Sequence, residues 1–470
     1  MSGEDSTVGG GRDNEASGDF STVSGGIGNT AEEMGSTTGG GRHNRATDRD
    51  STIGGGMGNQ ADGLWSTIGG GFRHVIMGET ATVGGGVANR AQGTSSTVAG
   101  GGQTTHLFRG GNHALGDWST ISGGAWNRAT GKYSSIGGGD SNHAERVYAT
   151  VGGGSDNIAR HRSSTIAGGG DNATTGNAAA IGGGVLNEAG GEAVVGGGRD
   201  NTANGRHATV GGGEENAASG IRATVGGGSD NTARHRSSTI AGGGDNTTTG
   251  NSAAIGGGVL NEAGGHAVVG GGRENKATSE YATVSGGQQN TAFGEWATIP
   301  GGFSNTASGD YAFAVGRQAN AIHAGAIVFG DSSTSEITSN ARDEARFQME
   351  VFAPEVSTQS ARAAKTNVEP IDPLAILEGV NSLEISCWEF REHDTGRHVG
   401  PMAGAFAETF SLGHDDDSIT TVDADGVALA AIQGLSQTLN EKDDRIADLE
   451  KRLTDLESKV GADERALADN

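Results

Sequence analysis

The stretch Ala297–Tyr311 reads ATIPGGFSNTASGDY, and Ser51–Trp65 reads STIGGGMGNQADGLW. Both are copies of one unit that returns about every fifteen residues from Ser6 to Tyr311, roughly twenty times in all. We number its positions 1 to 15 from the Ala or Ser that opens each copy. Because a fixed period of this size is typical of solenoids, the repeat decides the fold.

The pattern within each unit predicts two short strands per turn. Ala or Ser at position 1 and Val or Ile at position 3 flank a Thr, while Asn at position 9 and Ala at position 11 flank a variable residue. Such alternation gives each strand one inward face. Glycines at positions 5, 6 and 13 predict chain reversals with positive φ. We therefore expect a mainly β protein whose residues 1–330 form a thin parallel β-solenoid.

The recurrent asparagine at position 9 has two structural interpretations. Stacked copies could form an amide ladder along the axis, with neighbouring turns ~4.8 Å apart. Alternatively, each side chain could bond the backbone of its own turn. The segment 151–201 also recurs almost verbatim at 225–275, an offset of 74 residues, which indicates that the array grew by copying whole turns.

Composition excludes several classes of protein. The chain has 470 residues with 89 Gly, five Pro and no Gly-X-Y period, so it is not collagen. Its net charge of −25 argues against a nucleic-acid partner, and the acidic, lysine-poor surface suits a high-salt habitat. Cys387 is the single cysteine, which excludes an intrachain disulfide. Neither a signal peptide nor an apolar run long enough to span a membrane is expected.

The shaft itself offers only weak signs of ligand binding. An insertion after Ser96 predicts a loop at His106–Arg109, and loops on rigid scaffolds often bind ligands. Calcium-binding and ice-binding interpretations of the Asp and Thr rows are disfavoured, because position 8 varies freely and Thr is common on strands. Aromatic side chains at position 15 either stack on sugars or pack against a neighbouring chain. They are Phe20, Trp65, Trp118, Tyr133, Tyr148, Tyr281, Trp296 and Tyr311.

These small-residue repeats resemble the head repeats of trimeric autotransporter adhesins and the shafts of phage tail fibres. The resemblance implies a left-handed parallel β-roll assembled as a homotrimer, without chemistry of its own.

The repeat pattern and the composition of the sequence change after residue 330. We expect a neck or linker at 331–355, a small α+β domain at 356–430, a coiled coil at 431–462 and a flexible tail at 463–470. Within them the patterns predict strands over 345–352 and 382–390, and helices over 372–379 and 400–410. Apolar residues at a and d spacing predict the coiled coil. They are Ile432, Leu435, Leu439, Ile446, Leu449, Leu453, Leu456 and Val460, with Lys442 as the polar exception.

Three ordered motifs in this region carry a second resemblance. They are SARAAKTNVEPI at 360–371, RHVGPMAGAF at 397–406 and TVDADGVALAAIQGL at 421–435. They look like the intramolecular chaperone domain of phage endosialidases and tail fibres, a family of self-cleaving serine peptidases. The resemblance implies trimerisation, assistance in folding, and cleavage before a Ser whose partner Lys stands five residues later. It assigns Ser360 and Lys365 as the catalytic pair, Gln359–Ser360 as the scissile bond, and His398 as supporting or structural.

The residue types suit this chemistry. A serine hydroxyl needs a base near neutral pH, which a desolvated Lys can supply and an Arg cannot. Ala361 and Ala364 stand where the family has Asp and Leu, so a trimerisation cap that never cuts stays open as the alternative.

The sequence therefore predicts a trimeric viral tail fibre or spike, made in the host cytoplasm without a signal peptide and located in the virion. Its expected partners are two further copies of the chain, a host cell-surface receptor such as a glycan, and another virion tail protein. The alternative is a cell-surface trimeric adhesin with a non-cleaving cap. Beyond one intramolecular proteolytic turnover no enzyme activity is expected, nor any metal or cofactor.

Overall fold

The computed structural model describes residues 3–104, 109–349, 365–389, 397–412 and 418–468. The chain forms two compact units, the shaft unit Met1–Val351 and the C-terminal unit Phe352–Asn470.

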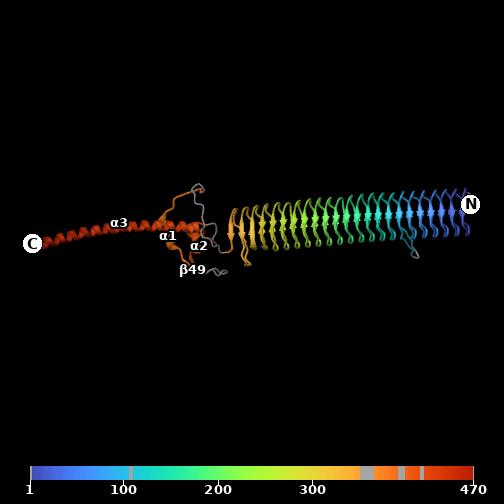
Figure 1. The fold of residues 1–470 in the computed structure, drawn as a ribbon. Coiled ribbons are helices and arrows are strands. Elements are labelled where there is room, and N and C mark those ends of the chain that lie inside the picture. The colour runs from blue at the N-terminus through green and yellow to red at the C-terminus, as the bar shows by residue number, and fades with distance from the viewer. Residues whose placement is uncertain (1–2, 105–108, 350–364, 390–396, 413–417, 469–470) are drawn as a thin grey trace. The chain divides into compact units, whose positions relative to one another are not determined.

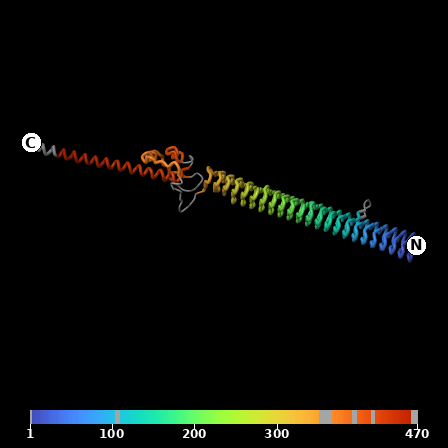
Figure 2. Tube along the Cα trace, turned by 90° about the horizontal axis from the view of Figure 1, so that it is seen from above, coloured from blue at the N-terminus to red at the C-terminus, as the bar shows by residue number. Residues whose placement is uncertain are grey.

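The shaft unit is a parallel β-solenoid of about 22 turns that follow one another in chain order (Figure 1). In a regular turn the first strand covers positions 2–3 and the second covers positions 10–11, as in β1 (Thr7–Val8) and β2 (Glu15–Ala16). β1 pairs in parallel with β3 (Thr22–Val23), and β2 pairs with β4 (Thr30–Ala31). Figure 2 shows the same succession of turns from above. The predicted fold class, a mainly β parallel solenoid, is confirmed.

Small side chains fill the interior of every turn. In one representative turn Ala149, Val151 and Ala159, at positions 1, 3 and 11, are fully buried, whereas Thr150 at position 2 faces outward. Stacking repeats these residues as continuous rows, which form one apolar cluster along most of the shaft. The inward faces predicted from the alternation are therefore correct.

The buried asparagine at position 9 acts both as a ladder and as a local cap. The backbone N–H of Asn157 donates to Oδ1 of Asn142 in the preceding turn at 3.1 Å. Its own Nδ2 donates to the carbonyl of Gly153 in the same turn at 3.0 Å and to that of Gly169 in the next turn at 2.9 Å. The Asn157 side chain thus bonds backbone groups of its own turn and of the next turn, and polar groups removed from water need such partners.

The prediction of positive φ at the glycines is correct at position 6 and wrong at position 13. Gly154, at position 6, has a φ of +89°. Gly131, at position 13, is needed for a close approach instead, because an added Cβ would lie 1.9 Å from the carbonyl oxygen of Arg146. Positive φ falls on non-glycine residues at positions 8 and 15, such as Asp156 (56°) and Tyr133 (58°). Each such residue costs about 1–2 kcal/mol.

Turns of irregular length keep the ladder intact. The insertion forms an antiparallel pair, β14 (Gln103–Thr104) with β15 (Arg109–Gly110), while the predicted loop residues 106–108 lie outside the described residues. Asn112 still donates its N–H to Oδ1 of Asn89, 23 residues earlier, at 2.9 Å. In a turn one residue short, Asn201 reaches Asn187 in the same way at 3.0 Å. Length changes are therefore absorbed at the corners.

The solenoid continues past residue 330, where the glycine pairs stop. The first sheet includes β44 (Phe313–Arg317), β46 (Ile327–Phe329) and β48 (Ala345–Phe347), and the second includes β45 (Ala319–Ala321) and β47 (Ile337–Thr338). All pair in parallel with the preceding turn. Phenylalanine rings line up across the last turns, with Phe329 and Phe347 stacked at 4.8 Å.

The described residues of the C-terminal unit form three helices and a short hairpin. They are α1 (Pro373–Ser382), β49 (Ser386–Trp388), β50 (His398–Gly400), α2 (Ala403–Phe410) and α3 (Thr421–Ala468). Asp372 caps α1 by accepting from the N–H of Leu374 at 3.0 Å. α1 packs on α3 at Gly434, where an added Cβ would lie 2.3 Å from the carbonyl oxygen of Pro373.

Candidate functional site

The structure describes only part of the predicted catalytic pair. Lys365 is exposed and stands at the start of the described segment that leads into α1. Ser360 and the scissile bond Gln359–Ser360 lie outside the described residues. The pair Ser360 and Lys365 therefore stays a prediction.

His398 has a defined packing partner. It lies in β50 directly opposite Trp388 in β49, and the two rings stack with centroids 4.8 Å apart at an angle of 25°. Both side chains are half-buried. This contact gives His398 a structural role in the hairpin, while a part in cleavage stays a prediction.

A shallow apolar hollow of about 390 Å³ lies beside this hairpin. Its lining comes from all three helices and the hairpin, and it contains no charged side chain. The lining residues are Val380, Leu383, Ile385, Trp388, Gly400, Pro401, Phe406, Ile419, Thr420, Thr421, Ala424, Val427 and Ala428. Exposed apolar surface of this kind marks a place where another protein surface packs.

The predicted heptad residues form an uncovered apolar stripe on α3. We call Ile432, Leu435, Leu439, Ile446, Leu449, Leu453, Leu456 and Val460 the heptad stripe. All are exposed in the single chain, from 49% for Leu435 to 63% for Ile432. Burying such a side chain contributes roughly 1.5–3 kcal/mol, so a helix that leaves eight of them in water favours association with other helices.

A second candidate site, which the sequence reasoning missed, lies on the shaft. Strands β18 (Arg128–Ala129) and β20 (His143–Ala144) place Arg128 and His143 in consecutive turns, and Arg160 follows β22 (Ile158–Ala159) in the next turn. Two shallow hollows of about 380 and 440 Å³ share Glu145 and Arg146. We call their Arg and His lining residues the basic groove. They are Arg128, His143, Arg146, Arg160, His161 and Arg162.

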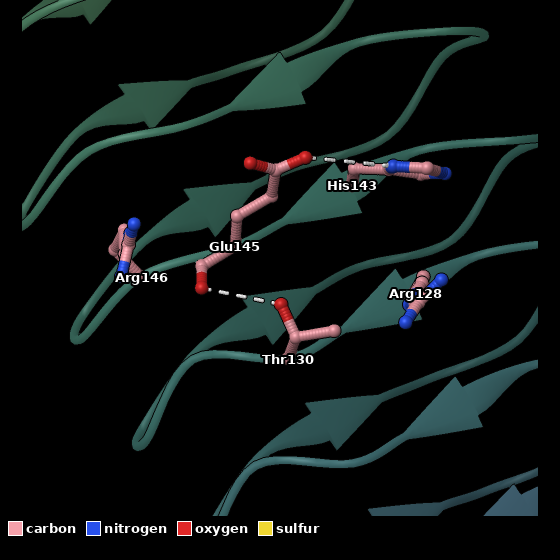
Figure 3. A pocket seen from close by; sticks show the side chains of 5 residues that line it. All are labelled: Arg128, Thr130, His143, Glu145 and Arg146. Carbon is pink, nitrogen blue, oxygen red and sulfur yellow. Dashed lines mark hydrogen bonds and ion pairs between the residues drawn. The ribbon is translucent and has the colours of Figure 1, made fainter.

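Figure 3 shows the first hollow and the few contacts within it. Nδ1 of His143 lies 3.8 Å from Oε1 of Glu145, and the hydroxyl of Thr130 donates to the Glu145 carbonyl at 3.1 Å. Arg128 and Arg146 lie on either side of Glu145. The signal in the sequence was a cation at positions 10, 12, 13 or 14 of successive turns, which become neighbours only once the turns are stacked.

Comparison with known proteins gives no family for this chain: no family model matches it, and no curated protein matches its sequence.

Two further searches concern the described residues alone. They contain no group of three or more His, Cys, Asp or Glu side chains placed to hold a metal ion. None of the helices they form is long and apolar enough to cross a membrane.

Proposed function

We propose that the chain is the structural protein of a trimeric viral tail fibre or spike that takes part in host attachment. The observation that carries the proposal is the heptad stripe on α3, which is exposed along the helix in a single chain. A helix with this surface is stabilised when identical helices bury the stripe against one another. The parallel solenoid supplies the extended body that such a fibre needs.

The C-terminal unit would act as the trimerisation chaperone. Joining three α3 helices in parallel aligns three chains before the solenoids form. This order is useful because pairing between distant strands is slow, and alignment lowers its entropic cost. The apolar hollow beside the hairpin adds a second surface that a neighbouring copy would cover.

The same unit would then release itself by cleavage between Gln359 and Ser360. The Lys365 amine would accept the proton of the Ser360 hydroxyl, whose oxygen attacks the Gln359 carbonyl, and would pass that proton to the Ser360 nitrogen as the peptide C–N bond breaks. Water would then hydrolyse the resulting ester, leaving a carboxylate on Gln359 and a free amino group on Ser360. The support is the resemblance of the three motifs, together with the choice of Lys in a chain that otherwise prefers Arg.

The test of cleavage combines a denaturing gel with mass spectrometry of the purified full chain. We expect a product ending at Gln359 and its loss in Ser360→Ala and in Lys365→Ala. Intact chain in the wild type would reduce the unit to a passive cap, as the adhesin alternative requires.

The test of assembly is the solution mass measured by light scattering on the Ser360→Ala protein, which keeps α3 attached. We expect a trimer, and we expect Leu449→Glu with Leu453→Glu to give monomers. Thr454→Glu with Ser458→Glu adds the same charge to α3 outside the heptad stripe and serves as the control. A monomeric parent protein would contradict the proposal.

A further inference from the structure

We infer that the basic groove on the shaft binds an acidic polysaccharide, with its arginines holding carboxylate or sulfate groups of the sugar chain. The inference deepens the proposed attachment function and rests on it for its biological meaning. The geometric arguments for anion binding do not depend on the proposed attachment function.

The first argument is the lack of internal partners for the arginines. Within the described part of the chain, no ion pair joins Arg128, Arg146, Arg160 or Arg162 to a carboxylate, and all four are exposed. Elsewhere on the shaft Arg45 pairs with Glu32 at 2.7 Å. Arg90 and Arg234 likewise have no ion pair among the described residues, so the distinguishing feature of the basic groove is that four such arginines from three turns line two adjoining hollows, where one anionic ligand would meet several of them.

The second argument is that the positive charge extends along the axis. Arg90, His113, Arg128 and His143 stand opposite one another on successive strands of the second sheet. The pKa of His113 is lowered by burial and also by the positive charges of Arg90 and Arg128. Arg90 and Arg128 therefore place positive charge on both sides of His113, and the row follows the stacking direction as an extended polymer would.

The third argument is an aromatic row at the adjacent corner. Trp118, Tyr133 and Tyr148 occupy position 15 of consecutive turns and stack at 5.2 and 5.1 Å between ring centroids. The Lys132 ammonium lies 4.7 Å from the Trp118 ring centroid. The Tyr148 turn contributes Arg146 at position 13 to the basic groove, and the following turn contributes Arg160 and Arg162 at positions 12 and 14. Aromatic faces beside cations suit sugar rings that carry negative charges.

A polysaccharide fits better than a nucleic acid. The chain carries a net charge of −25, and Glu145 lies within the groove itself. A nucleic acid bears a negative charge on every nucleotide, so both the net negative charge of the chain and the Glu145 carboxylate would repel it. A sugar polymer has sparser charge, and its hydroxyl groups can donate hydrogen bonds to Glu145.

The chain contains its own matched control. The segment ARHRSST occurs at 159–165 and again at 233–239. In the second copy, Gly220 stands where Arg146 precedes the first copy, and Ala217 stands in place of His143. Arg234 and Arg236 therefore repeat the local sequence of Arg160 and Arg162 without the other cations of the basic groove.

The experiment uses the full-length chain and a fluorescent hyaluronate oligosaccharide, which carries one carboxylate on every second sugar, with binding followed by anisotropy at low and high salt. We expect Arg160→Ala with Arg162→Ala to weaken binding about tenfold, or ~1.4 kcal/mol, and Arg234→Ala with Arg236→Ala to have little effect. A neutral dextran oligosaccharide should not bind. Light scattering on each variant reports assembly separately.

Three results would overturn the inference even if the oligosaccharide binds. They are equal losses in both double variants, single-stranded DNA bound more tightly than the oligosaccharide, or loss of oligomeric mass in Arg160→Ala with Arg162→Ala. The last result would make the basic groove a contact between copies. Failure to bind with assembly and cleavage intact would reject the polysaccharide alone and leave the proposed fibre standing.

Discussion

The backbone N–H of Asn89 donates a hydrogen bond to Nδ1 of His74, 3.1 Å away, at a step of the ladder where adjacent turns use an asparagine Oδ1. The His74 side chain is fully buried. Because Nδ1 must accept this bond, the imidazole is held neutral. Its other nitrogen, Nε2, is buried without a hydrogen-bond partner of normal geometry among the described residues.

This step of the ladder should weaken in acid. Burial lowers the pKa of His74, and backbone hydrogen bonding to Gly86 offsets part of the effect. The unfolded chain therefore binds the proton at higher pH than the folded chain. The contribution of His74 to stability is complete above about pH 6.5 and is lost as the pH falls toward the lowered folded pKa.

We expect amide exchange of Asn89 to accelerate in this pH range, after correction for intrinsic exchange, and His74→Asn to remove the acceleration. His235→Asn, at an exposed corner, should leave it unchanged. An identical pH profile in His74→Asn would contradict the assignment.

The ladder asparagines should be among the most costly residues to replace. Asn157→Ala removes donors to Gly153 and Gly169 and an acceptor for Asn172, and it leaves buried backbone groups unpaired. We expect a loss of about 2–4 kcal/mol, since each unpaired buried group costs roughly 1–3 kcal/mol. Exchange protection of the adjoining turns measures it. Asn177→Ala, on an exposed side chain, is the control, and equal losses would refute a special role for position 9.

Two adjacent glycines of one corner should differ in how well they tolerate an added Cβ atom. Gly124 has a φ of +82°, and a Cβ there would lie 2.0 Å from the carbonyl oxygen of Gly139, whereas a Cβ at Gly123 meets nothing within 4 Å. We expect Gly124→Ala to lower the thermal midpoint by several degrees and Gly123→Ala to leave it nearly unchanged. A comparable fall of the thermal midpoint in both variants would contradict the clash at Gly124, because it would mean that the corner backbone shifts to make room for the added Cβ.

The two glycines of α3 form a similar pair. A Cβ at Gly434 would meet Pro373 and Leu377 of α1, while Gly426 has open space. We expect Gly434→Ala to loosen α1 and cost about 1–3 kcal/mol, and Gly426→Ala to stabilise the helix by ~1 kcal/mol. Exchange protection of α1 distinguishes them, and unchanged protection in Gly434→Ala would contradict the packing described.

The acidic surface should make stability depend on salt. With a net charge of −25, raising NaCl from about 0.05 to 1 M should screen self-repulsion and raise the thermal midpoint. An uncharged osmolyte at matched osmolality controls for general effects of solute. A thermal midpoint that does not change with NaCl concentration would contradict the high-salt habitat.

The sequence predicts most of the fold because each inward row is one residue type repeated at one position. Val151, Asn157 and Ala159 are buried where the alternation places them. The sequence could not place positive φ at Tyr133, because sterics favour glycine at such a position. Only the stacked turn shows why Gly131 is needed two positions earlier.

The candidate sites were predictable to different degrees. The heptad stripe follows from spacing within one helix, so the sequence was sufficient to find it. The basic groove was missed, since Arg128, Arg146 and Arg160 belong to three different turns and become neighbours only through the lateral register of the stack.

The hydrogen-bond ladder at position 9, which continues across turns of unequal length, has a consequence for how such a chain can evolve. Asn112 reaches Asn89 over 23 residues and Asn201 reaches Asn187 over 14, with hydrogen bonds of 2.9 and 3.0 Å. The corners therefore accept insertions and deletions without disturbing the rows that hold the coil together. The length of the shaft unit is set by the number of copied turns, whereas the residues of a single corner can change without altering the buried rows. Shaft length and corner sequence can therefore evolve independently.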